Sequence, residues 1–120
     1  MSRVSDLYLR DILRAIGRIE RLLANTDRDS FTPDNVLIDG VLFNLMAIGE
    51  AAKNIPDEVR SQMPEIRWRD IGRFRDRVVH HYFALNLDIV WEIVTLHLPL
   101  LKAAVEKLGQ GHEENDHSSR

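Results

Sequence analysis

The sequence predicts a single all-α domain, an antiparallel bundle of four to five helices with long first, second and last helices. Apolar residues recur at three- and four-residue steps over most of the 120 residues, which is the spacing of one helix face. No stretch alternates apolar and polar residues with the two-residue period of a strand. A chain of this length can bury one hydrophobic core without disulfides or metal staples.

The first helix is expected over about residues 3–25, because its apolar residues gather on one face and most of its charged residues fall elsewhere. The polar stretch 25–30 should end it. The second helix should begin at Thr32-Pro33-Asp34, where threonine caps, proline suits the first helical position and aspartate favours the positive end of the dipole. It should stop near Asn54, since Pro56 follows. Glu50 is expected to face inward from it.

The second half of the chain predicts a short helical turn over 56–63, ended by Pro64, and then a third helix. That helix should open at Trp68 and end between His80 and Phe83. The last helix should span about 89–108 after a cap at Asn86 or Asp88. Pro99 lies inside this helix and predicts a kink one turn earlier, and two glycines, Gly109 and Gly111, should stop it.

Composition sets the expected domain limits and compartment. Residues 1–108 are predicted to form the domain, and residues 109–120 hold no apolar side chain and are expected to be a disordered tail. The absence of cysteine excludes disulfides and thiolate metal sites and favours a reducing cytoplasm. Charges every few residues near the N-terminus argue against a signal peptide and a membrane span. We expect a soluble cytoplasmic protein that needs no metal and no cofactor.

A net charge of −3 argues against a general nucleic-acid binder, but the charges are uneven. Residues 67–77 hold five arginines against two aspartates. Arginine is a planar cation suited to phosphate, and histidine titrates near neutrality. The segment 73–82 therefore combines a phosphate-binding group with a proton-transfer group, as phosphodiester chemistry requires. A basic helix face that ends in capping or packing histidines is the simpler interpretation of the same residues.

Spacing adds information about Arg75, His80 and Tyr82. With 13 arginines and 5 histidines in the chain, Arg-x4-His is expected about 0.5 times by chance, and about 0.01 times once a tyrosine two residues later is required. Residues five apart on a regular helix differ by about 140° in direction. Arg75 and His80 would then point to different faces. Either the helix loosens near His80, or a second copy of the same surface completes the site across a two-fold axis; we favour the second.

Several separated motifs carry a resemblance to a known family. In order and spacing the chain resembles the HEPN superfamily and, within it, the HepT-like ribonuclease toxins, over nearly all of its length to about Leu108, through the segments 44–53, 66–71, 75–83, 88–91 and 98–101. The resemblance implies an all-α HEPN bundle acting as a homodimer, with a metal-independent RNA-cleaving site in the cleft between protomers.

The resemblance also assigns roles by the motif Arg-x4-His-x-Tyr. It implies Arg75 as the phosphate-stabilising cation, His80 as the proton-transfer residue and Tyr82 as the tyrosine of the motif. Asp76 is an accepted residue type after the arginine and would orient Arg75 or His80. The position between His80 and Tyr82 is often glutamate in this family, whereas here it is His81, which is either neutral or a second titratable group that shares the role of His80.

The family further implies a partner, a minimal nucleotidyltransferase (MntA-like) antitoxin that adds AMP to the tyrosine, here Tyr82. We expect Glu50 to support the site or to form a salt bridge away from it. Arg73 and Arg77 are expected to add affinity for RNA. The alternative to a toxin of a type II/VII-like toxin–antitoxin system is a non-catalytic HEPN module that binds a nucleotide or docks a nucleotidyltransferase. A purely structural helical adaptor would leave the arginine–histidine cluster unexplained.

Overall fold

The computed structural model describes residues 3–118, and every regular element in that range is helical. The all-α prediction is therefore confirmed. The elements are α1 Arg3–Leu23, α2 Arg28–Phe31, α3 Asn35–Lys53, α4 Asp57–Arg60, α5 Trp68–His80, a 3-10 turn η1 Tyr82–Ala84, α6 Leu87–Glu92, a π-helical stretch η2 Ile93–His97, and α7 Leu98–Ser118.

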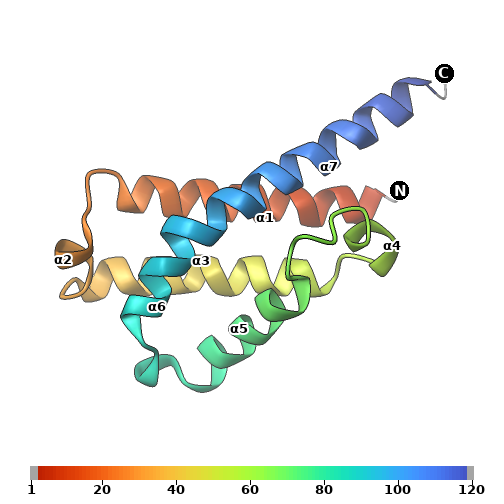
Figure 1. Ribbon diagram of the computed structural model, residues 1–120. Helices are drawn as coiled ribbons and strands as arrows, with labels where there is room; N and C mark the ends of the chain where they lie inside the picture. Colours follow the sequence, from red (N-terminus) through yellow and green to blue (C-terminus); the bar gives the residue numbers. More distant parts are fainter. Residues whose placement is uncertain (1–2, 119–120) are drawn as a thin grey trace.

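The central helix of the bundle is α3 (Figure 1). It runs antiparallel to α1 on one side and packs against α5 on the other, and α6, η2 and α7 form a continuous rod that crosses α1 obliquely. The core between them is aliphatic apart from a few aromatic rings, and its fully buried members include Ile12, Ile16, Ile19, Phe31, Val41, Leu42, Ile48, Val78, Val90 and Val105.

Helix α3 is apolar because it is packed on two sides. By length and composition alone this 19-residue helix could cross a membrane. Nine of its residues are buried in the bundle, however, and a core helix of a globular domain has the same composition. Its apolar character is explained by the contacts with α1 and α5.

The connection before α3 differs from the prediction in two details. Residues 25–30 were expected to be a turn, but they include the start of α2, which Asp27 caps by accepting a 2.8 Å hydrogen bond from the Ser30 N–H. The cap of α3 is Asp34, whose carboxylate accepts from the Leu37 N–H at 3.0 Å, and not Thr32, which ends α2. Aspartate outcompetes threonine here because either residue can cap and Asp34 stands nearer the apolar run.

The predicted irregularity before Pro99 is a π-helical stretch. Proline has no N–H to donate to the carbonyl four residues earlier, and its ring crowds that carbonyl. The helix widens over Ile93–His97 and resumes as α7 at Leu98. The Thr95 hydroxyl donates to the Trp91 carbonyl at 2.8 Å within the same turn.

The predicted stop of the last helix at Gly109 and Gly111 is wrong, because α7 continues to Ser118. Each glycine weakens a helix by only about 1 kcal/mol, and no proline follows to break it. Leu108 is the last core residue among the described side chains, and α7 then projects beyond the bundle (Figure 1). Residues 119–120 lie outside the described range. The domain limit at residue 108 remains a prediction, whereas residues 109–118 of the predicted disordered tail are helical.

Candidate active site

The contact between α3 and α5 is closest at Gly49 and Arg75. A Cβ atom placed on Gly49 would lie 2.3 Å from the Arg75 Cβ and 3.1 Å from the Ile71 carbonyl oxygen. Any side chain at residue 49 would therefore push the two helices apart. The small residue at this point is what lets the backbone of α5 approach α3 and hold Arg75 over its edge.

Two carboxylates surround the Arg75 guanidinium. Its NH1 group donates to Asp76 Oδ1 at 3.2 Å, and its Nε lies 3.2 Å from Glu50 Oε2. The second contact is an ion pair without hydrogen-bond geometry, so the buried Arg75 Nε–H has no acceptor. Glu50 was expected to face inward, but it is exposed, because its position on α3 lies between the faces that pack on α1 and α5.

Asp76 lies between two cations. Its carboxylate accepts hydrogen bonds from Lys53 at the end of α3 and from Arg75 beside it. The Lys53 hydrogen bond, with a smaller contribution from Arg75, holds the pKa of Asp76 below its usual value. Asp76 is therefore ionised at neutral pH and fixes Arg75. It makes no contact with His80 among the interactions of the described residues, so the role of orienting His80 has no support here.

His80 and His81 lie at the end of α5, and both are exposed. The helix remains α-helical through His80, and the His81 N–H closes it by donating to the Arg77 carbonyl at 2.8 Å. The helix therefore does not loosen before His80. On this regular helix Arg75 points toward α3 and His80 points about 140° away from it, so one protomer does not bring the two side chains to one face.

Tyr82 begins η1 and reaches back to α3. Its hydroxyl donates to Asp39 Oδ1 at 2.6 Å, and burial together with that hydrogen bond raises the pKa of Tyr82 to about 12. The phenol is therefore protonated at neutral pH. The sequence reasoning did not identify Asp39, because 43 residues separate it from Tyr82 and nothing in its local sequence marks it.

The remaining arginines of α5 are on its solvent side. Arg73 and Arg77, predicted to contact RNA, are both exposed, as are Arg67 and Arg69. Arg73 NH1 lies 4.0 Å from Asp70 Oδ1, and Arg67 Nε lies 2.7 Å from Asp70 Oδ2. Such exposed pairs are weak and leave the guanidinium groups available to an anion.

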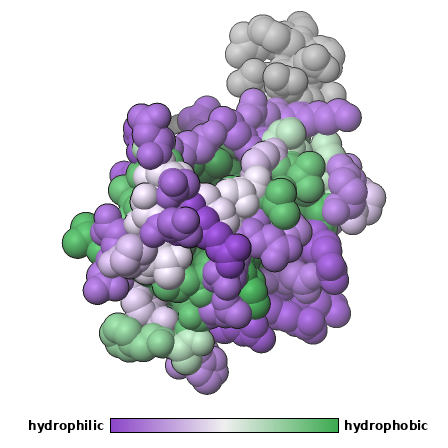
Figure 2. Space-filling model, turned by 60° about the vertical axis from the view of Figure 1, so that its left-hand side comes forward, coloured by the Kyte–Doolittle hydropathy of each residue, from purple (hydrophilic) through white to green (hydrophobic). Residues whose placement is uncertain are grey.

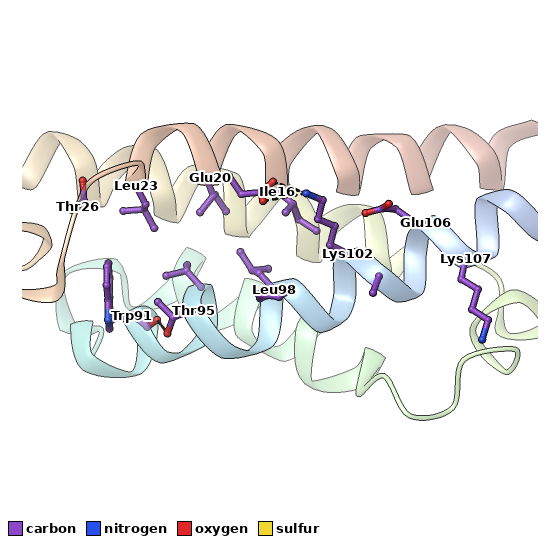
Figure 3. A pocket seen from close by; sticks show the side chains of 14 residues that line it. Ile16, Glu20, Leu23, Thr26, Trp91, Thr95, Leu98, Lys102, Glu106 and Lys107 are labelled. Atoms are coloured by element: carbon purple, nitrogen blue, oxygen red, sulfur yellow. Dashed lines mark hydrogen bonds and ion pairs between the residues drawn. The ribbon is translucent and has the colours of Figure 1, made fainter.

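A more voluminous groove lies elsewhere. It measures about 940 Å³ and runs between α1 and the rod formed by α6, η2 and α7 (Figure 3). Ile16, Leu23, Trp91 and Leu98 form its walls, and Lys102 crosses it to Glu20 at 3.1 Å. None of the motif residues lines it. We interpret it as the seam between two helices that cross at an angle, and not as a catalytic pocket.

No group of three or more histidine, cysteine or carboxylate side chains is arranged to hold a metal ion within the described part of the chain. Of the titratable groups on α3, α5 and η1, Glu50 and Asp76 pair with Arg75, and Tyr82 bonds to Asp39, whereas His80 lies on another face of α5. Arginine can bind a phosphate and histidine can move a proton, but one protomer does not present the two on one face.

The all-α bundle is the fold that the resemblance to HEPN-type proteins implies. The comparison with known families agrees: the family described as ribonuclease HepT-like matches residues 12–108. The chain belongs to this HepT-like ribonuclease family.

Three relatives illustrate the likeness. A protein of Thermococcus cleftensis named probable ribonuclease HepT is 38% identical over 108 residues, which cover 90% of this chain and 98% of that protein. A protein of Methanocaldococcus jannaschii named as an inferred RNase is 32% identical, with 93% of each chain covered. Another inferred RNase, from Caldanaerobacter subterraneus, is 32% identical over 86% of this chain and 92% of its own. No solved structure matches the chain.

Proposed function

We propose that this protein is a metal-independent endoribonuclease, the toxin of a type II/VII-like toxin–antitoxin system, with Arg75 and His80 as its catalytic residues. Membership of a ribonuclease family supports the substrate class. The single observation that carries the site is the Arg75 guanidinium, held by Asp76 and Glu50 at the edge of the α3–α5 contact while one of its N–H groups lacks an acceptor.

The proposed chemistry needs one base and one cation. His80 takes the proton of the ribose 2′-hydroxyl, the 2′-oxygen attacks the adjacent phosphorus, and the bond from phosphorus to the 5′-oxygen breaks. The 5′-oxygen leaves with a proton, and the products are a 2′,3′-cyclic phosphate and a 5′-hydroxyl. Arg75 stabilises the negative charge that builds on the phosphate oxygens. DNA lacks the 2′-hydroxyl and is not cleaved by this route.

A homodimer supports this chemistry better than one protomer. Arg75 and His80 point to different faces of α5, so a second copy is needed to supply the missing group. An apolar surface lies nearby: Phe43 is 58% exposed and Phe83 is 99% exposed. On α3, Val36, Asp39, Phe43 and Glu50 follow one another at helical steps of three, four and seven residues. Exposed apolar side chains and the partners of Tyr82 and Arg75 therefore share a face that a second protomer would cover.

The exposed surface agrees with a mixed interface. Figure 2 turns the end of the bundle that carries α2 and α6 forward and shows apolar residues at the surface in several patches among hydrophilic ones. Exposed aromatic residues at the centre of such patches are common anchors in protein interfaces.

A complementation experiment tests the dimer cleft. Arg75→Ala and His80→Ala protomers should each be inactive alone. When they are mixed under conditions that exchange protomers, half of the dimers should contain both variants, and each of these should hold one intact site. About one quarter of the wild-type activity is then expected. Mixtures with no activity would contradict a site shared between protomers.

Regulation follows from the position of Tyr82. A minimal nucleotidyltransferase of the MntA type is the proposed antitoxin, and it would transfer AMP from ATP to the Tyr82 hydroxyl with release of pyrophosphate. Asp39 accepts a hydrogen bond from that hydroxyl, so it is placed to receive the proton as the oxygen attacks. The added phosphate would bring negative charge to the cleft and repel an RNA phosphate. We place the protein in the cytoplasm, where both its substrate and a nucleotide-dependent partner would be found.

A non-catalytic docking subunit of a nucleotidyltransferase is the second candidate, because the same Tyr82–Asp39 pair would serve as an acceptor site without cleavage of RNA. Cell growth separates the two. Expression of the protein without a partner should stop growth if it is a ribonuclease, and His80→Ala should restore growth at equal protein level. Harmless expression of the unmodified wild-type protein would favour the docking subunit.

A further inference from the structure

A second groove lies beside the candidate active site and has no role in the mechanism above. It measures about 750 Å³ and runs between the end of α3, α4, the following loop and the first half of α5. Six of its 11 lining residues are charged, namely Lys53, Asp57, Arg60, Arg69, Arg73 and Asp76.

The groove has a positive balance, with four cations against two carboxylates. Asp76 is already neutralised by Lys53 and Arg75, and Asp57, whose side chain is 94% exposed, pairs with Arg60. Arg69 makes no ion pair with any described residue, and Arg73 has only the 4.0 Å contact with Asp70. Two guanidinium groups are therefore free to bind an anion.

Helix α5 connects this groove to His80. Residues 69, 73, 76 and 80 follow at steps of four, three and four, so they lie along one face of the helix. Residues 69 and 80 are 11 positions apart, which is close to three full turns and a rise of about 16 Å. A chain that lies on this face passes Arg69 and Arg73 and then reaches His80.

Arg60 pairs with Asp57 through one amino group, but its Nε–H has no acceptor. In the described part of the chain two buried side-chain nitrogen atoms lack a hydrogen-bond acceptor, and they are Arg60 Nε and Arg75 Nε. A buried donor without an acceptor is unfavourable, because it has lost its hydrogen bonds to water. One of these donors belongs to the proposed catalytic arginine, and the other to the wall of the groove. A phosphate bound in the groove would offer an acceptor to the Arg60 guanidinium.

We infer that this groove binds the phosphate backbone of single-stranded RNA next to the cleavage site, through Arg60, Arg69 and Arg73. The inference rests on the proposed ribonuclease function and names the path of its substrate. Arginine matches phosphate geometry with paired N–H groups. Trp68 also lines the groove, but it is 8% exposed and its indole N–H donates to the Met63 carbonyl, so it offers no stacking face. The groove therefore recognises the backbone and not the bases.

The test separates binding from cleavage by use of a His80→Ala background. A fluorescently labelled 12-nucleotide RNA is titrated by anisotropy, and Arg69→Gln/Arg73→Gln is compared with Arg10→Gln/Arg21→Gln, which removes the same charge from exposed positions on α1. We expect the groove variant to bind at least tenfold more weakly at 100 mM salt. Its slope of log K against log salt should fall by about 1.4, since each phosphate contact with a single strand contributes about 0.7.

A spectroscopic signal locates the bound RNA. Trp68 lines the groove, whereas Trp91 lines the distant groove between α1 and α7. In a His80→Ala/Trp91→Phe protein the remaining tryptophan is therefore a reporter of this site. RNA should change its emission, and the change should require about tenfold more RNA once Arg69 and Arg73 are replaced by glutamine.

Three outcomes would overturn the inference. The first is equal RNA affinity of the groove variant and the α1 control variant. The second is RNA binding that leaves Trp68 emission unchanged. The third is displacement of the RNA by AMP or inorganic phosphate at concentrations similar to those of the oligomer, which would make the groove a site for a free nucleotide or ion.

Cleavage by wild-type protein distinguishes this inference from the proposed function. If wild-type protein does not cleave RNA but the groove variant loses RNA binding, RNA binding in the groove is supported and the ribonuclease proposal is contradicted. If wild-type protein cleaves RNA and the groove variant cleaves a 12-mer with unchanged kcat/KM, the ribonuclease proposal is supported and RNA binding in the groove is contradicted. If both the ribonuclease proposal and the groove inference hold, the groove variant should lose more kcat/KM on the 12-mer than on a dinucleotide, because a dinucleotide is too short to reach the groove.

Discussion

The two sides of the bundle use their helix contacts differently. Between α3 and α5 the backbones meet at Gly49, and charged groups surround the contact, with a guanidinium N–H that lacks an acceptor. Between α1 and α7 the helices diverge, and the groove they leave is apolar and crossed by one satisfied ion pair, Glu20–Lys102. The larger groove thus holds none of the motif residues, whereas the tighter contact holds Arg75. The proposed site lies at the tighter contact and not at the larger groove.

The largest effect on this comparison should come from Gly49→Ala. Its added methyl group would lie 2.3 Å from the Arg75 Cβ, so α5 must move away from α3. We expect a loss of about 1–3 kcal/mol in the free energy of unfolding and a fall in cleavage rate, because Arg75 moves with the helix. Chemical denaturation and RNA cleavage measure the two effects.

Gly17→Ala is the matched control on α1. The nearest atom to its added methyl group is the end of the Arg21 side chain at 3.5 Å, so no backbone has to shift. Alanine also favours a helix over glycine, and we expect a gain of about 0.5–1 kcal/mol with unchanged cleavage. Equal stability of the two variants would contradict the claim that the Gly49 contact sets the distance between α3 and α5.

The Asp39–Tyr82 hydrogen bond should have the next largest effect. Asp39→Asn is expected to lose about 1 kcal/mol of stability and to lower the pKa of Tyr82 from about 12 toward its usual value, although burial keeps part of the shift. Ultraviolet titration of tyrosinate in a Tyr8→Phe background measures the pKa of Tyr82. An unchanged titration would show that Tyr82 does not donate to Asp39 in solution.

The same hydrogen bond predicts a dependence on alkaline pH. The pKa of Tyr82 is raised in the folded state, so its contribution to stability is complete below the usual phenol pKa of 10 and is lost as pH rises toward about 12. The wild-type protein should therefore lose stability between these values, and Asp39→Asn should lose less over the same range.

Asp76 predicts the opposite dependence at acid pH. Its pKa is lowered by Lys53 and Arg75, so its contribution is present above the usual aspartate pKa of 3.8 and is lost as pH falls through the lower folded-state pKa. Asp76→Asn should be less stable than wild type at neutral pH, and the difference should shrink below pH 4. Asp11→Asn, at an exposed position on α1, should leave the acid dependence unchanged. A constant difference across pH would show that Asp76 contributes by shape alone.

The smallest effect should come from the ion pair of the larger groove. Both side chains of Glu20–Lys102 are about half exposed, and such pairs contribute up to about 1 kcal/mol at low salt. Lys102→Gln should therefore change the midpoint of unfolding slightly, lose even that effect in 1 M salt, and leave RNA cleavage at the wild-type level. Loss of cleavage in Lys102→Gln would contradict the interpretation that the groove between α1 and α7 takes no part in catalysis.

Local patterns were sufficient for much of the fold. Apolar spacing predicted α1, α3 and α5, and Pro99 predicted the irregular turn before it, because each rests on neighbours within one or two turns. The motif spacing identified Arg75, His80 and Tyr82 as candidates, and the fold places Arg75 and Tyr82 against α3. The prediction that Gly109 and Gly111 end the last helix was wrong, since a helix tolerates glycine when nothing else competes for the backbone.

The missed features depend on contacts between distant residues. Asp39 meets Tyr82 across 43 positions, and Arg60 joins Arg69 and Arg73 only because the loop after α4 turns the chain back onto α5. The exposure of Glu50 depends on the angle at which α3 meets both neighbours. No periodicity within one segment carries that information.

The most direct test of the central claim is cleavage of a mixed RNA substrate by the purified, unmodified protein in EDTA, with His80→Ala and His81→Ala measured beside it. The account predicts cleavage in EDTA that falls by 10²- to 10⁴-fold in His80→Ala, the usual contribution of a general base, while His81→Ala retains most of the activity. Products should carry a 2′,3′-cyclic phosphate. Equal cleavage by wild type and His80→Ala, or no cleavage by the unmodified wild type, would contradict it.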